Sequence, residues 1–433
     1  MINSKTTEYY HASYGMSLNY LSEYISNKAQ QDRRLNCIII SFLLAMFIFT
    51  FVFSKPIFAY VDNETIDTTS PPIHQKINFE QNIKNKYQKA YITFPAKGIA
   101  HIKKTKYVNN KPIKINIVEI NTKINKNLSI KPQIASSKLN NKRTIRKIAQ
   151  QENAIVAING GYFKPQTGVP LGALMIDRNV LTGPIFNRVG IAIFDDGEDI
   201  SFKMDNINFD IMAYTKSKAV KIDNINQPRM LSTYTLMYTP VWGKFSPPAP
   251  KYGYNMLVVG NKITKISANA IEFLPNSVVI SAPKAVIVGL AKNNKEIYID
   301  IKLQESLSGA NHIIGAGPYL VKDGQIYVDY KEEKLTAISG KNPRSAIGYK
   351  NDGSFMIVTI DGREHASVGM TLYELARFMK EIGCEYAMNF DGGSSSALYV
   401  DGKIANSAHN KEGIAISNAL IVSEENSVQI SSL

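Results

Sequence analysis

The alternation of apolar and polar residues predicts that most of the chain forms β-strands joined by hairpins. From about residue 90 onward, short apolar runs alternate with turn residues, and residues 113–120 (IKINIVEI) show the period of two that is typical of a half-buried strand. Asp-Gly pairs begin at positions 196, 323, 352, 361, 391 and 401. Asp-Gly favours tight hairpins because both central residues of a type I′ turn need positive φ. We therefore expect twisted sheets rich in hairpins.

Two segments instead have a helical pattern. Thr371 and Glu374 form a capping box, an apolar stripe with helical spacing follows, and Gly383 suits the C′ position. Thr144 can cap a shorter helix that ends at Gln151, ahead of an apolar strand at 154–158. The predicted fold class is α/β in the mixed α+β sense: one large domain of twisted β-sheets with a few helices.

A third pattern is the uncharged run at residues 38–53, IIISFLLAMFIFTFVF. Sixteen helical residues span about 24 Å, slightly less than the hydrocarbon core of a bilayer. Arg33 and Arg34 precede the run, so residues 1–36 should stay in the cytoplasm and the rest should be exported. We expect residues 37–54 to be a signal anchor or the hydrophobic segment of a cleaved signal peptide, with a buried core helix as the remaining alternative. The body would then lie in the periplasm or at the cell surface.

The charge of the chain is concentrated in one stretch. The 433 residues carry a formal charge of +14, and residues 61–150 hold 18 Lys or Arg against 5 Asp or Glu. We interpret residues 55–89 as a polar basic stalk and residues 90–433 as the globular domain. Lysine dominates the basic stretch, whereas nucleic-acid grooves interleave arginine with aromatic residues, so we expect no nucleic-acid partner. The lysines form either a solvated face or a weak attraction for an anionic polymer or headgroup surface.

Cysteine and histidine usage points away from zinc. Cys384 is the one cysteine beyond the apolar run, and it follows a helix end, where we expect a small buried thiol. The six histidines show no HExxH or HxH spacing. We predict no cofactor, while a calcium site built from carboxylates stays open.

Polar residues follow three predicted strands at the points where these strands end. Residues 386–396 (YAMNFDGGSSS) place Asn389 and Asp391 at a strand end, before two glycines and three serines. Residues 159–163 (NGGYF) and 361–363 (DGR) have similar settings. Each segment alone is explained by a hairpin turn. Together they predict a site at one sheet edge, with exposed N–H groups and hydroxyls that could cradle an oxyanion or phosphate.

Arginines at strand starts could hold the same anion. The segments 188–197 and 344–353 resemble each other, and each begins with arginine and ends in Asp-Gly. Arg188 and Arg344 could therefore converge on one anion. Glu374 has two interpretations, because its capping box is a sufficient explanation but its carboxylate could also line the site.

Five ordered motifs resemble the phosphodiester glycosidase family. They are NGGYF at 159–163, NPRSAIGYKNDG at 342–353, TIDGR at 359–363, GMTLYELARFM at 369–379 and NFDGGSSSALYVDG at 389–402. Two features depart from the family pattern. Ser394 stands where the family usually has a third glycine, and no arginine directly precedes SNAL at 417–420. The resemblance implies an α/β fold in one large domain and hydrolysis of the glycosidic C–O bond of sugar-1-phosphodiesters, such as N-acetylglucosamine-1-phosphodiester.

With that resemblance, each motif residue acquires an expected role. Asp391 would be the nucleophile or base, with Asp361 as the alternate, because a phosphate leaving group needs little acid assistance. The residues expected to bind phosphate or sugar, or to orient Asp391, are Arg344, Arg363, Gly392, Gly393, Ser394, Ser395, Ser396, Asn389, Asn159, Gly160, Gly161, Tyr162, Arg188 and Glu374.

Two other functions compete with this hypothesis. A non-catalytic module could bind anionic envelope glycans through the same loops. A phosphodiesterase could instead cut the P–O bond, which normally needs a metal or an activated nucleophile. The expected partner is a phosphorylated glycan or sugar phosphodiester of the cell envelope or of an exopolysaccharide, together with the membrane through residues 37–54. Oligomeric state has no sequence signal here.

Overall fold

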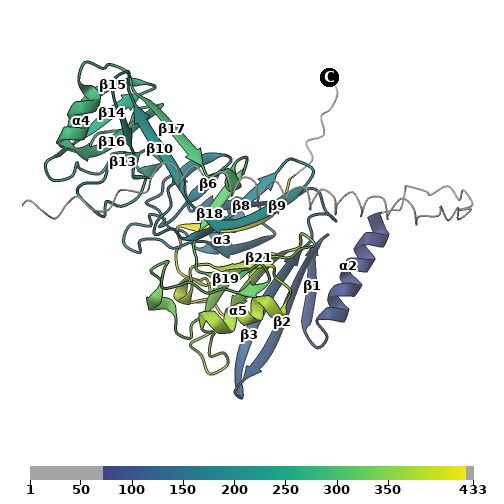
Figure 1. Ribbon diagram of the computed structural model, residues 1–433. Helices are drawn as coiled ribbons and strands as arrows, with labels where there is room; N and C mark the ends of the chain where they lie inside the picture. The colour runs from purple at the N-terminus through teal and green to yellow at the C-terminus, as the bar shows by residue number, and fades with distance from the viewer. Residues whose placement is uncertain (1–71, 426–433) are drawn as a thin grey trace, which may run out of the picture. The chain divides into compact units, whose positions relative to one another are not determined.

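The computed structural model describes residues 72–425, with side chains from residue 78 onward (Figure 1). The predicted membrane segment 37–54 and the cytoplasmic tail before it lie outside these residues. Within residues 72–425, no helix is both long and apolar enough to cross a bilayer. All described residues belong to one compact unit, Ser70–Leu433.

Two large sheets carry the strand ends that matter for the site. One sheet has eight strands, in the order β1 (Tyr91–Ala96), β2 (Ile99–Val108), β3 (Lys111–Ile120), β22 (Phe355–Ile360), β21 (Arg344–Tyr349), β23 (Tyr386–Asn389), β19 (Tyr319–Lys322) and β20 (Gln325–Ile326). The other has five, in the order β25 (Lys403–Ile404), β24 (Leu398–Val400), β5 (Val156–Asn159), β26 (Asn418–Glu424) and β4 (Leu128–Ile134).

Three further sheets complete the described residues. The first has the order β7 (Asn179–Thr182), β6 (Leu174–Ile176), β18 (His312–Gly315), β8 (Val189–Asp195) and β9 (Ile200–Asn206). The second has the order β11 (Ala219–Lys221), β10 (Phe209–Tyr214) and β17 (Tyr298–Leu303). The third has the order β12 (Asn224–Ile225), β13 (Leu236–Tyr238), β16 (Ser277–Pro283), β14 (Gly253–Val259) and β15 (Lys262–Ser267).

Helices are few among the described residues. The α-helices are α2 (Pro72–Lys86), α3 (Ile145–Gln151), α4 (Lys284–Ala291) and α5 (Leu372–Glu381). Single 3₁₀ turns are η1 (Pro240–Trp242), η2 (Glu305–Leu307), η3 (Thr336–Ile338) and η4 (Gly393–Ser395). The neighbouring strands pair antiparallel in this part of the chain, apart from the parallel pair β12–β13. The β-rich architecture with a few helices is therefore confirmed, in its α+β rather than its alternating α/β form.

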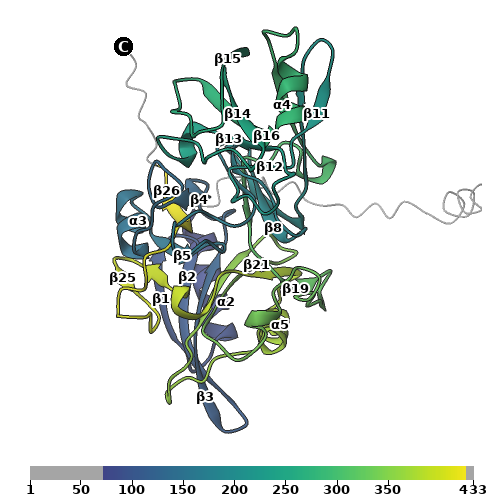
Figure 2. The ribbon, with the colours of Figure 1, turned by 90° about the vertical axis from the view of Figure 1, so that its left-hand side faces the viewer.

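The main core lies between sheets. The inner face of the eight-stranded sheet contributes Val118, Phe355 and Met388, which pack with Ile158 of β5 and Ile191 of β8. Its outer face is covered by α2 and α5. Helix α3 packs on the outer face of the β5–β24–β26 sheet (Figure 2). Strand β3 is thus covered on both sides, and its last six residues are all buried rather than half-buried as the alternation predicted.

Helix α2 corrects the predicted stalk. Residues 72–86 fell within the expected stalk at 55–89, but they form a helix. Phe79, Ile83 and the following Tyr87 are buried against the eight-stranded sheet, and the Tyr87 hydroxyl donates to Glu119 at 3.1 Å. Phe79, Ile83 and Tyr87 thus dock this segment on the sheet.

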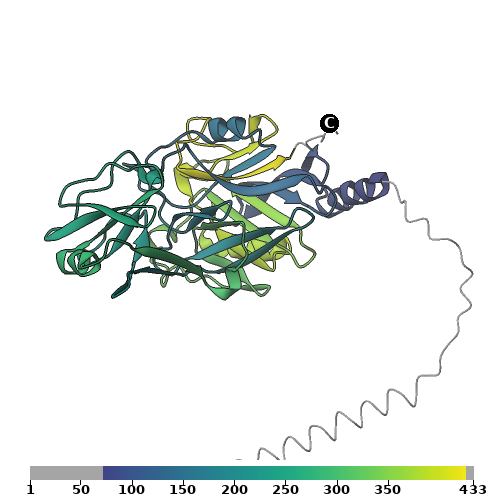
Figure 3. The ribbon, with the colours of Figure 1, turned by 90° about the horizontal axis from the view of Figure 1, so that it is seen from above.

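A block of strands is inserted between β9 and β18. Strands β10 to β17 and helix α4 pack around Ile211, Met256 and Ile287, and this cluster continues to Met175 of β6 and Ala192 of β8. The insertion and helix α2 lie at opposite ends of the described residues (Figure 3).

Four of the six Asp-Gly pairs form hairpins. They join β8 to β9, β19 to β20, β21 to β22 and β24 to β25. Both residues have positive φ in two of them, Asp323–Gly324 and Asp401–Gly402. The pairs at 361 and 391 are the exceptions, because the chain there leaves the sheet for a loop instead of turning back. Local turn chemistry was overridden at these two positions, and both belong to the candidate site.

The predicted helices are confirmed with one correction. Helix α5 has the predicted capping box, and its stripe of Leu372, Leu375, Ala376 and Met379 is buried. Helix α3 begins after Thr144 as expected, but the Thr144 side chain makes no capping hydrogen bond.

Candidate functional site

The predicted strand ends meet at one edge. Arg344 opens β21 opposite Ile360, the last residue of β22, and Ala346 lies opposite Asn389, the last residue of β23. Strand β5 of the other large sheet ends beside them, because the N–H of Asp391 donates to the Gly160 carbonyl at 3.1 Å. Loops from two sheets therefore form one cluster, as the sequence predicted.

Asn159 ties this cluster together. Its side chain is 1% exposed, and Nδ2 donates to the Asp391 carbonyl at 2.7 Å. Oδ1 accepts from the Ser345 hydroxyl at 2.6 Å and from the Ala397 N–H at 3.1 Å. One amide thus joins the ends of β5, β21 and β23, and Asn159 acts as a structural clamp rather than as a sugar contact.

Among the acidic residues of the cluster, Asp391 has the carboxyl group best suited to act as a nucleophile or base. It is partly exposed, and its Oδ1 accepts from the Gly392 N–H at 2.9 Å. Burial raises the pKa of Asp391 to about 6, although hydrogen bonds from Ser395 and from the Gly392 N–H oppose the shift. A carboxyl with this pKa is ionised at neutral pH, yet it is more basic than an ordinary aspartate.

Tyr162 and Asn389 meet on the carbonyl of Gly317. The Tyr162 hydroxyl donates to that carbonyl at 2.7 Å, and Asn389 Nδ2 donates to the Tyr162 hydroxyl at 3.1 Å. Burial raises the pKa of Tyr162, and the nearby Asp391 charge adds to the effect. The Asn389 Oδ1 is buried and has no hydrogen-bond partner among the described residues. Ser396 Oγ and Glu333 Oε2 are likewise buried without a partner among the described residues, and Asn389 itself is 0% exposed.

The two arginines of the repeated segments approach the same tyrosine. The Arg188 guanidinium lies 5.1 Å from the Tyr162 ring centre, and both Arg188 and Arg344 lower the pKa of the Tyr162 phenol. Arg188 is 8% exposed and its Nε donates to the Glu333 carbonyl at 3.1 Å. Arg188 thus lies over a neutral phenol, and the convergence of the two arginines on one anion stays a prediction.

Glu333 was missed by the sequence analysis. Its carboxyl is 1% exposed, Oε1 accepts from the Val189 N–H at 3.3 Å, and burial with the nearby Asp329 raises the pKa of Glu333 to about 9. A Cβ on Gly317 would lie 1.8 Å from Glu333 Oε2, so this carboxyl supports the turn that holds Tyr162 and Asn389. Glu333 lies in the charged run KEEK at 331–334, and nothing local distinguishes it from its solvent-facing neighbours.

Arg344 differs from its expected role as a phosphate fork. It is 1% exposed, Nε donates to the Met370 carbonyl at 2.9 Å, and Nη2 donates to the carbonyls of Ile338, at 2.7 Å, and Gly340. Burial lowers the pKa of Arg344 to about 10, which leaves it cationic at neutral pH. Two of its three guanidinium nitrogens therefore hold the 338–370 loops in place, and its Cδ would lie 4.0 Å from a Cβ on Gly392.

Arg363 is better placed to meet a ligand. It is exposed, and its Nε and Nη2 donate to Asn342 Oδ1 at 3.2 and 2.7 Å. A Cβ on Gly393 would lie 3.1 Å from Nη2 and 3.6 Å from Nη1, so the guanidinium packs directly against the 391–396 loop. The Arg363 Nη1 has no protein partner within residues 72–425.

The carboxyl groups of the other two acidic candidates, Asp361 and Glu374, are paired with neighbouring groups of the fold. Asp361 is 3% exposed and its Oδ1 accepts from the Ser407 N–H at 3.0 Å, while burial raises the pKa of Asp361. Glu374 accepts from the Thr371 N–H at 2.8 Å and pairs with Lys341 at 3.1 Å. Burial would raise the pKa of Glu374, but these hydrogen bonds hold it below its usual value. The capping explanation of Glu374 is thus sufficient.

The expected cradle of free N–H groups is not formed by the 392–396 loop. The Gly392 N–H donates to Asp391, the Gly393 N–H to the Pro343 carbonyl at 2.9 Å, and those of Ser395 and Ser396 to the carbonyls of Gly392 and Gly393. The 3₁₀ turn η4 uses these donors internally. Ser394, the departure from the family pattern, is the exposed residue of the turn, and its N–H has no partner among the described residues.

Gly160 and Gly161 are required by close packing instead of by a ligand. A Cβ on Gly160 would lie 2.0 Å from Asn418 Oδ1, and a Cβ on Gly161 would lie 2.4 Å from the Gly315 carbonyl oxygen. The Gly161 N–H donates to Asn418 Oδ1 at 2.8 Å. These glycines let β5 end against β26 and β18.

No group of three or more His, Cys, Asp or Glu side chains able to hold a metal ion occurs within the described residues. Cys384 is 3% exposed, and burial raises the pKa of its thiol to about 12. The prediction that Cys384 is a small buried thiol is therefore confirmed.

Residues 251–423 match the model of the family described as "Phosphodiester glycosidase", which confirms the resemblance over that part of the chain. The NGGYF motif at 159–163 lies outside the matched range, although Asn159 and Tyr162 join the same cluster.

Two curated relatives match shorter stretches. The SPbeta prophage-derived uncharacterized protein YomE of Bacillus subtilis (strain 168) is 33% identical over 133 residues, which are 30% of this chain and 20% of that protein. N-acetylglucosamine-1-phosphodiester alpha-N-acetylglucosaminidase of Mus musculus is 26% identical over 98 residues, 20% of this chain and 19% of that enzyme. The chain thus spans about a fifth of each of these relatives.

Solved structures share the fold. A hypothetical protein from Synechocystis superimposes with a TM-score of 0.71 at 22% identity, over 78% of this chain and 64% of that one. A protein named "Putative exported protein" from Burkholderia pseudomallei K96243 gives a TM-score of 0.61 at 19% identity, over 72% and 74% of the two chains.

Proposed function

We propose that the protein hydrolyses the glycosidic C–O bond of sugar-1-phosphodiesters, such as N-acetylglucosamine-1-phosphodiester. The observation that carries this proposal is Asp391, a partly exposed carboxyl with a pKa raised to about 6 where the strand ends meet. The family match over residues 251–423 and the printed activity of the mouse relative support the same reaction.

The chemistry of this bond suits such a site. The leaving group is a phosphate monoester, a stable anion whose second pKa is about 6, so it needs little help from a general acid. The C1–O bond breaks with its electron pair on the phosphate oxygen. Asp391 either attacks C1, to give a glycosyl-enzyme that water then hydrolyses, or removes a proton from the attacking water. In both routes hydroxide is added at C1 and the remaining proton passes to the buffer or the phosphate.

The phosphate would be bound by groups that the fold leaves unpaired. Arg363 Nη1 and the Ser394 N–H have no protein partner in the described part of the chain, and both belong to the rim of the 391–396 loop. Arg344, buried and cationic at the start of β21, would add a favourable potential. The partly exposed Tyr162 ring, with the Arg188 guanidinium over it, would form the adjoining wall.

The proposed setting is outside the cytoplasm, on phosphorylated cell-envelope or exopolysaccharide glycans. The apolar run at 38–53, with two arginines before it, and the name of the Burkholderia structural relative support export by anchor or signal peptide.

The test is an assay of the full chain on the methyl phosphodiester of N-acetylglucosamine-1-phosphate. The parent should release free N-acetylglucosamine, Asp391→Asn should lose at least a thousandfold in kcat, and Arg363→Ala should mainly raise KM. Arg377→Ala, which changes an exposed arginine on α5, is the matched control and should leave both constants unchanged. Release of N-acetylglucosamine-1-phosphate would identify P–O cleavage instead, and full turnover by Asp391→Asn would overturn the mechanism.

One observation favours the competing function, a non-catalytic module for anionic glycans. A cavity of about 470 Å³ beside Arg363 is lined by Lys111 and His365, which are both exposed, and its one carboxylate is that of Glu364. If the protein only binds, Asp391→Asn should bind the phosphodiester as the parent does and neither should turn it over.

A further inference from the structure

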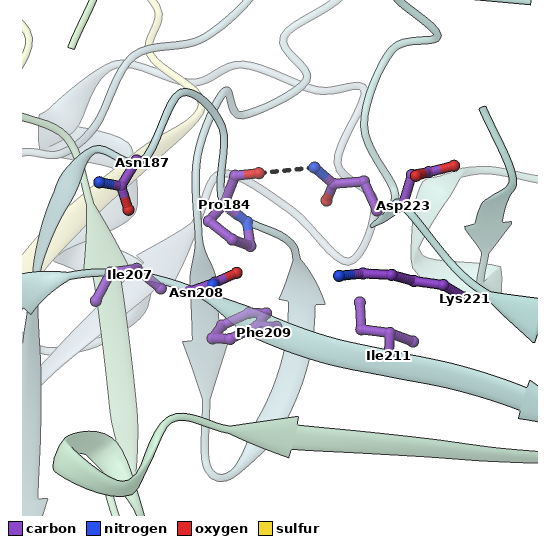
Figure 4. A pocket seen from close by; sticks show the side chains of 9 residues that line it. Pro184, Asn187, Ile207, Asn208, Phe209, Ile211, Lys221 and Asp223 are labelled. Atoms are coloured by element: carbon purple, nitrogen blue, oxygen red, sulfur yellow. Dashed lines mark hydrogen bonds between the residues drawn. The ribbon is translucent and has the colours of Figure 1, made fainter. Parts of the chain in front are cut away.

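A second cavity, away from the strand-end cluster, has the features of a preformed ligand site. Its volume is about 340 Å³, and it lies where the inserted strands join the β8–β9 hairpin. Its lining comes from the 184–187 loop, from residues 207–211 and from residues 221–224 (Figure 4). This volume is at the small end of the range for ligand pockets, which fits a unit of one or two rings.

The floor of the cavity is apolar and buried. Ile207 and Ile211 are 1% and 2% exposed, and the ring of Phe209 is 6% exposed between them. An apolar floor with an aromatic ring matches the C–H face of a pyranose ring.

The rim is polar and carries no net charge. Lys221, Asp223, Asn187 and Asn208 are the exposed residues of this rim, and Figure 4 shows the Lys221 ammonium extending toward Asn208. Lys221 Nζ and the side-chain amides of the two asparagines have no hydrogen-bond partner within residues 72–425. One ammonium, one carboxylate and two amides offer both donors and acceptors, as a neutral polyhydroxylated ligand requires.

The walls are held in position by hydrogen bonds. Asn224 Nδ2 donates to the Pro184 carbonyl at 2.7 Å, and the Asn206 side chain donates to the Asn187 carbonyl at 2.7 Å. The Asn208 N–H donates to Gln304 at 2.8 Å, and Asp223 accepts from the Thr235 N–H at 2.7 Å. Because the walls are already braced, a ligand would pay little for ordering them.

From this combination we propose that the cavity is a carbohydrate-binding site for a neutral sugar unit, separate from the strand-end cluster. Asn187 precedes Arg188, whose guanidinium lies over Tyr162, so the two sites are neighbours along the chain. The site would retain a glycan beside the cluster. Binding here does not depend on hydrolysis, so the inference stands independently of the proposed reaction.

The experiment titrates the full chain with neutral oligosaccharides of glucose, galactose, mannose and N-acetylglucosamine, followed by calorimetry and saturation-transfer NMR. At least one probe should bind, and Lys221→Ala and Asn208→Ala should each weaken it about three- to tenfold, the loss of roughly one hydrogen bond. Both residues are exposed, so the variants should unfold at the parent's temperature.

Lys216→Ala is the matched control, because Lys216 is an exposed lysine in the β10–β11 turn outside the cavity lining. It should bind the probe as the parent does. Three results would overturn the proposal: no neutral probe binds, the bound probe is indifferent to Lys221→Ala and Asn208→Ala, or only a uronate or glycerol-phosphate oligomer responds to these two variants.

Discussion

Replacing Asn159 by alanine tests whether one buried amide holds the strand ends together. The change deletes a group that is 1% exposed and that makes hydrogen bonds of 2.7, 2.6 and 3.1 Å to Asp391, Ser345 and Ala397. Two of these partners are backbone groups that cannot turn away to another acceptor or donor.

The expected cost follows from what is left unpaired. Each buried polar group that loses its partner costs about 1–3 kcal/mol, and the Ser345 hydroxyl can recover part of its share by rotation. We therefore expect Asn159→Ala to lower the free energy of unfolding by about 3–5 kcal/mol. Asn159→Asp should be nearly as costly, because it keeps the acceptor but loses the donor to the Asp391 carbonyl.

The assay is urea unfolding of the full chain, followed by tryptophan fluorescence and circular dichroism. Asn179→Ala is the control, since Asn179 is exposed and its amide makes one local hydrogen bond, to the Asp177 carbonyl. It should change the free energy of unfolding by less than about 0.5 kcal/mol. A loss below about 1 kcal/mol for Asn159→Ala would refute the clamp, since three unpaired groups cannot cost so little.

Four further predictions concern the same cluster. Gly161→Ala should destabilise the fold by about 1–3 kcal/mol in the same urea assay, because its Cβ would lie 2.4 Å from the Gly315 oxygen, whereas Gly340→Ala, with no atom within 4 Å of its Cβ, should be neutral. Because the pKa of Asp391 is raised to about 6, turnover should rise as pH increases through 6 and level off above 7, and a flat profile from pH 4.5 to 7.5 would exclude Asp391 as the reacting carboxylate. Because the pKa of Asp391 is raised, the folded state binds this proton more tightly than the unfolded state. The contribution of Asp391 to stability is therefore present at low pH and is lost as pH rises through 6. The melting temperature of Asp391→Asn should accordingly exceed that of the parent by more at pH 7 than at pH 4. Glu333→Gln should melt close to the parent at pH 7, because burial and Asp329 raise the pKa of Glu333 to about 9 and keep it neutral. Glu333→Ala leaves the Val189 N–H unpaired and should melt several degrees lower. Equal melting temperatures of the two variants would contradict the assignment of Glu333 as a buried neutral carboxyl.

The sequence pattern predicted the location of the cluster but not the duties of its residues. Asn159 and Asp391 were selected because strands end in polar residues, and Arg344 because it begins a strand in a repeated segment; the structure does bring their strand ends to one edge. Their hydrogen-bond partners could not be predicted from the local sequence, because the hydrogen bond from Asn159 to Asp391 joins residues 232 positions apart. The carbonyl partners of Arg344 could not be predicted for the same reason. Its Nε and Nη2 donate to the carbonyls of Met370 and Ile338, which belong to loops whose path is set only by the packed fold.

Glu333 shows most clearly which features the local sequence cannot predict. In the sequence it is one of several charged residues in a loop, and in the fold it is a buried carboxyl against Gly317. Burial of a charged side chain depends on which other segments cover it, and no local periodicity records that.

The features that the sequence determined by itself are those governed by neighbouring residues. The capping box of α5, the apolar strands, and the hairpins at Asp323–Gly324 and Asp401–Gly402 each depend on propensities and hydrogen bonds within a few positions. The tertiary structure alone decided which Asp-Gly pairs would not turn back, which glycines face a neighbouring backbone, and which carboxyl would have its pKa raised. These outcomes depend on contacts and desolvation between distant segments, and those free energies arise only when the sheets pack.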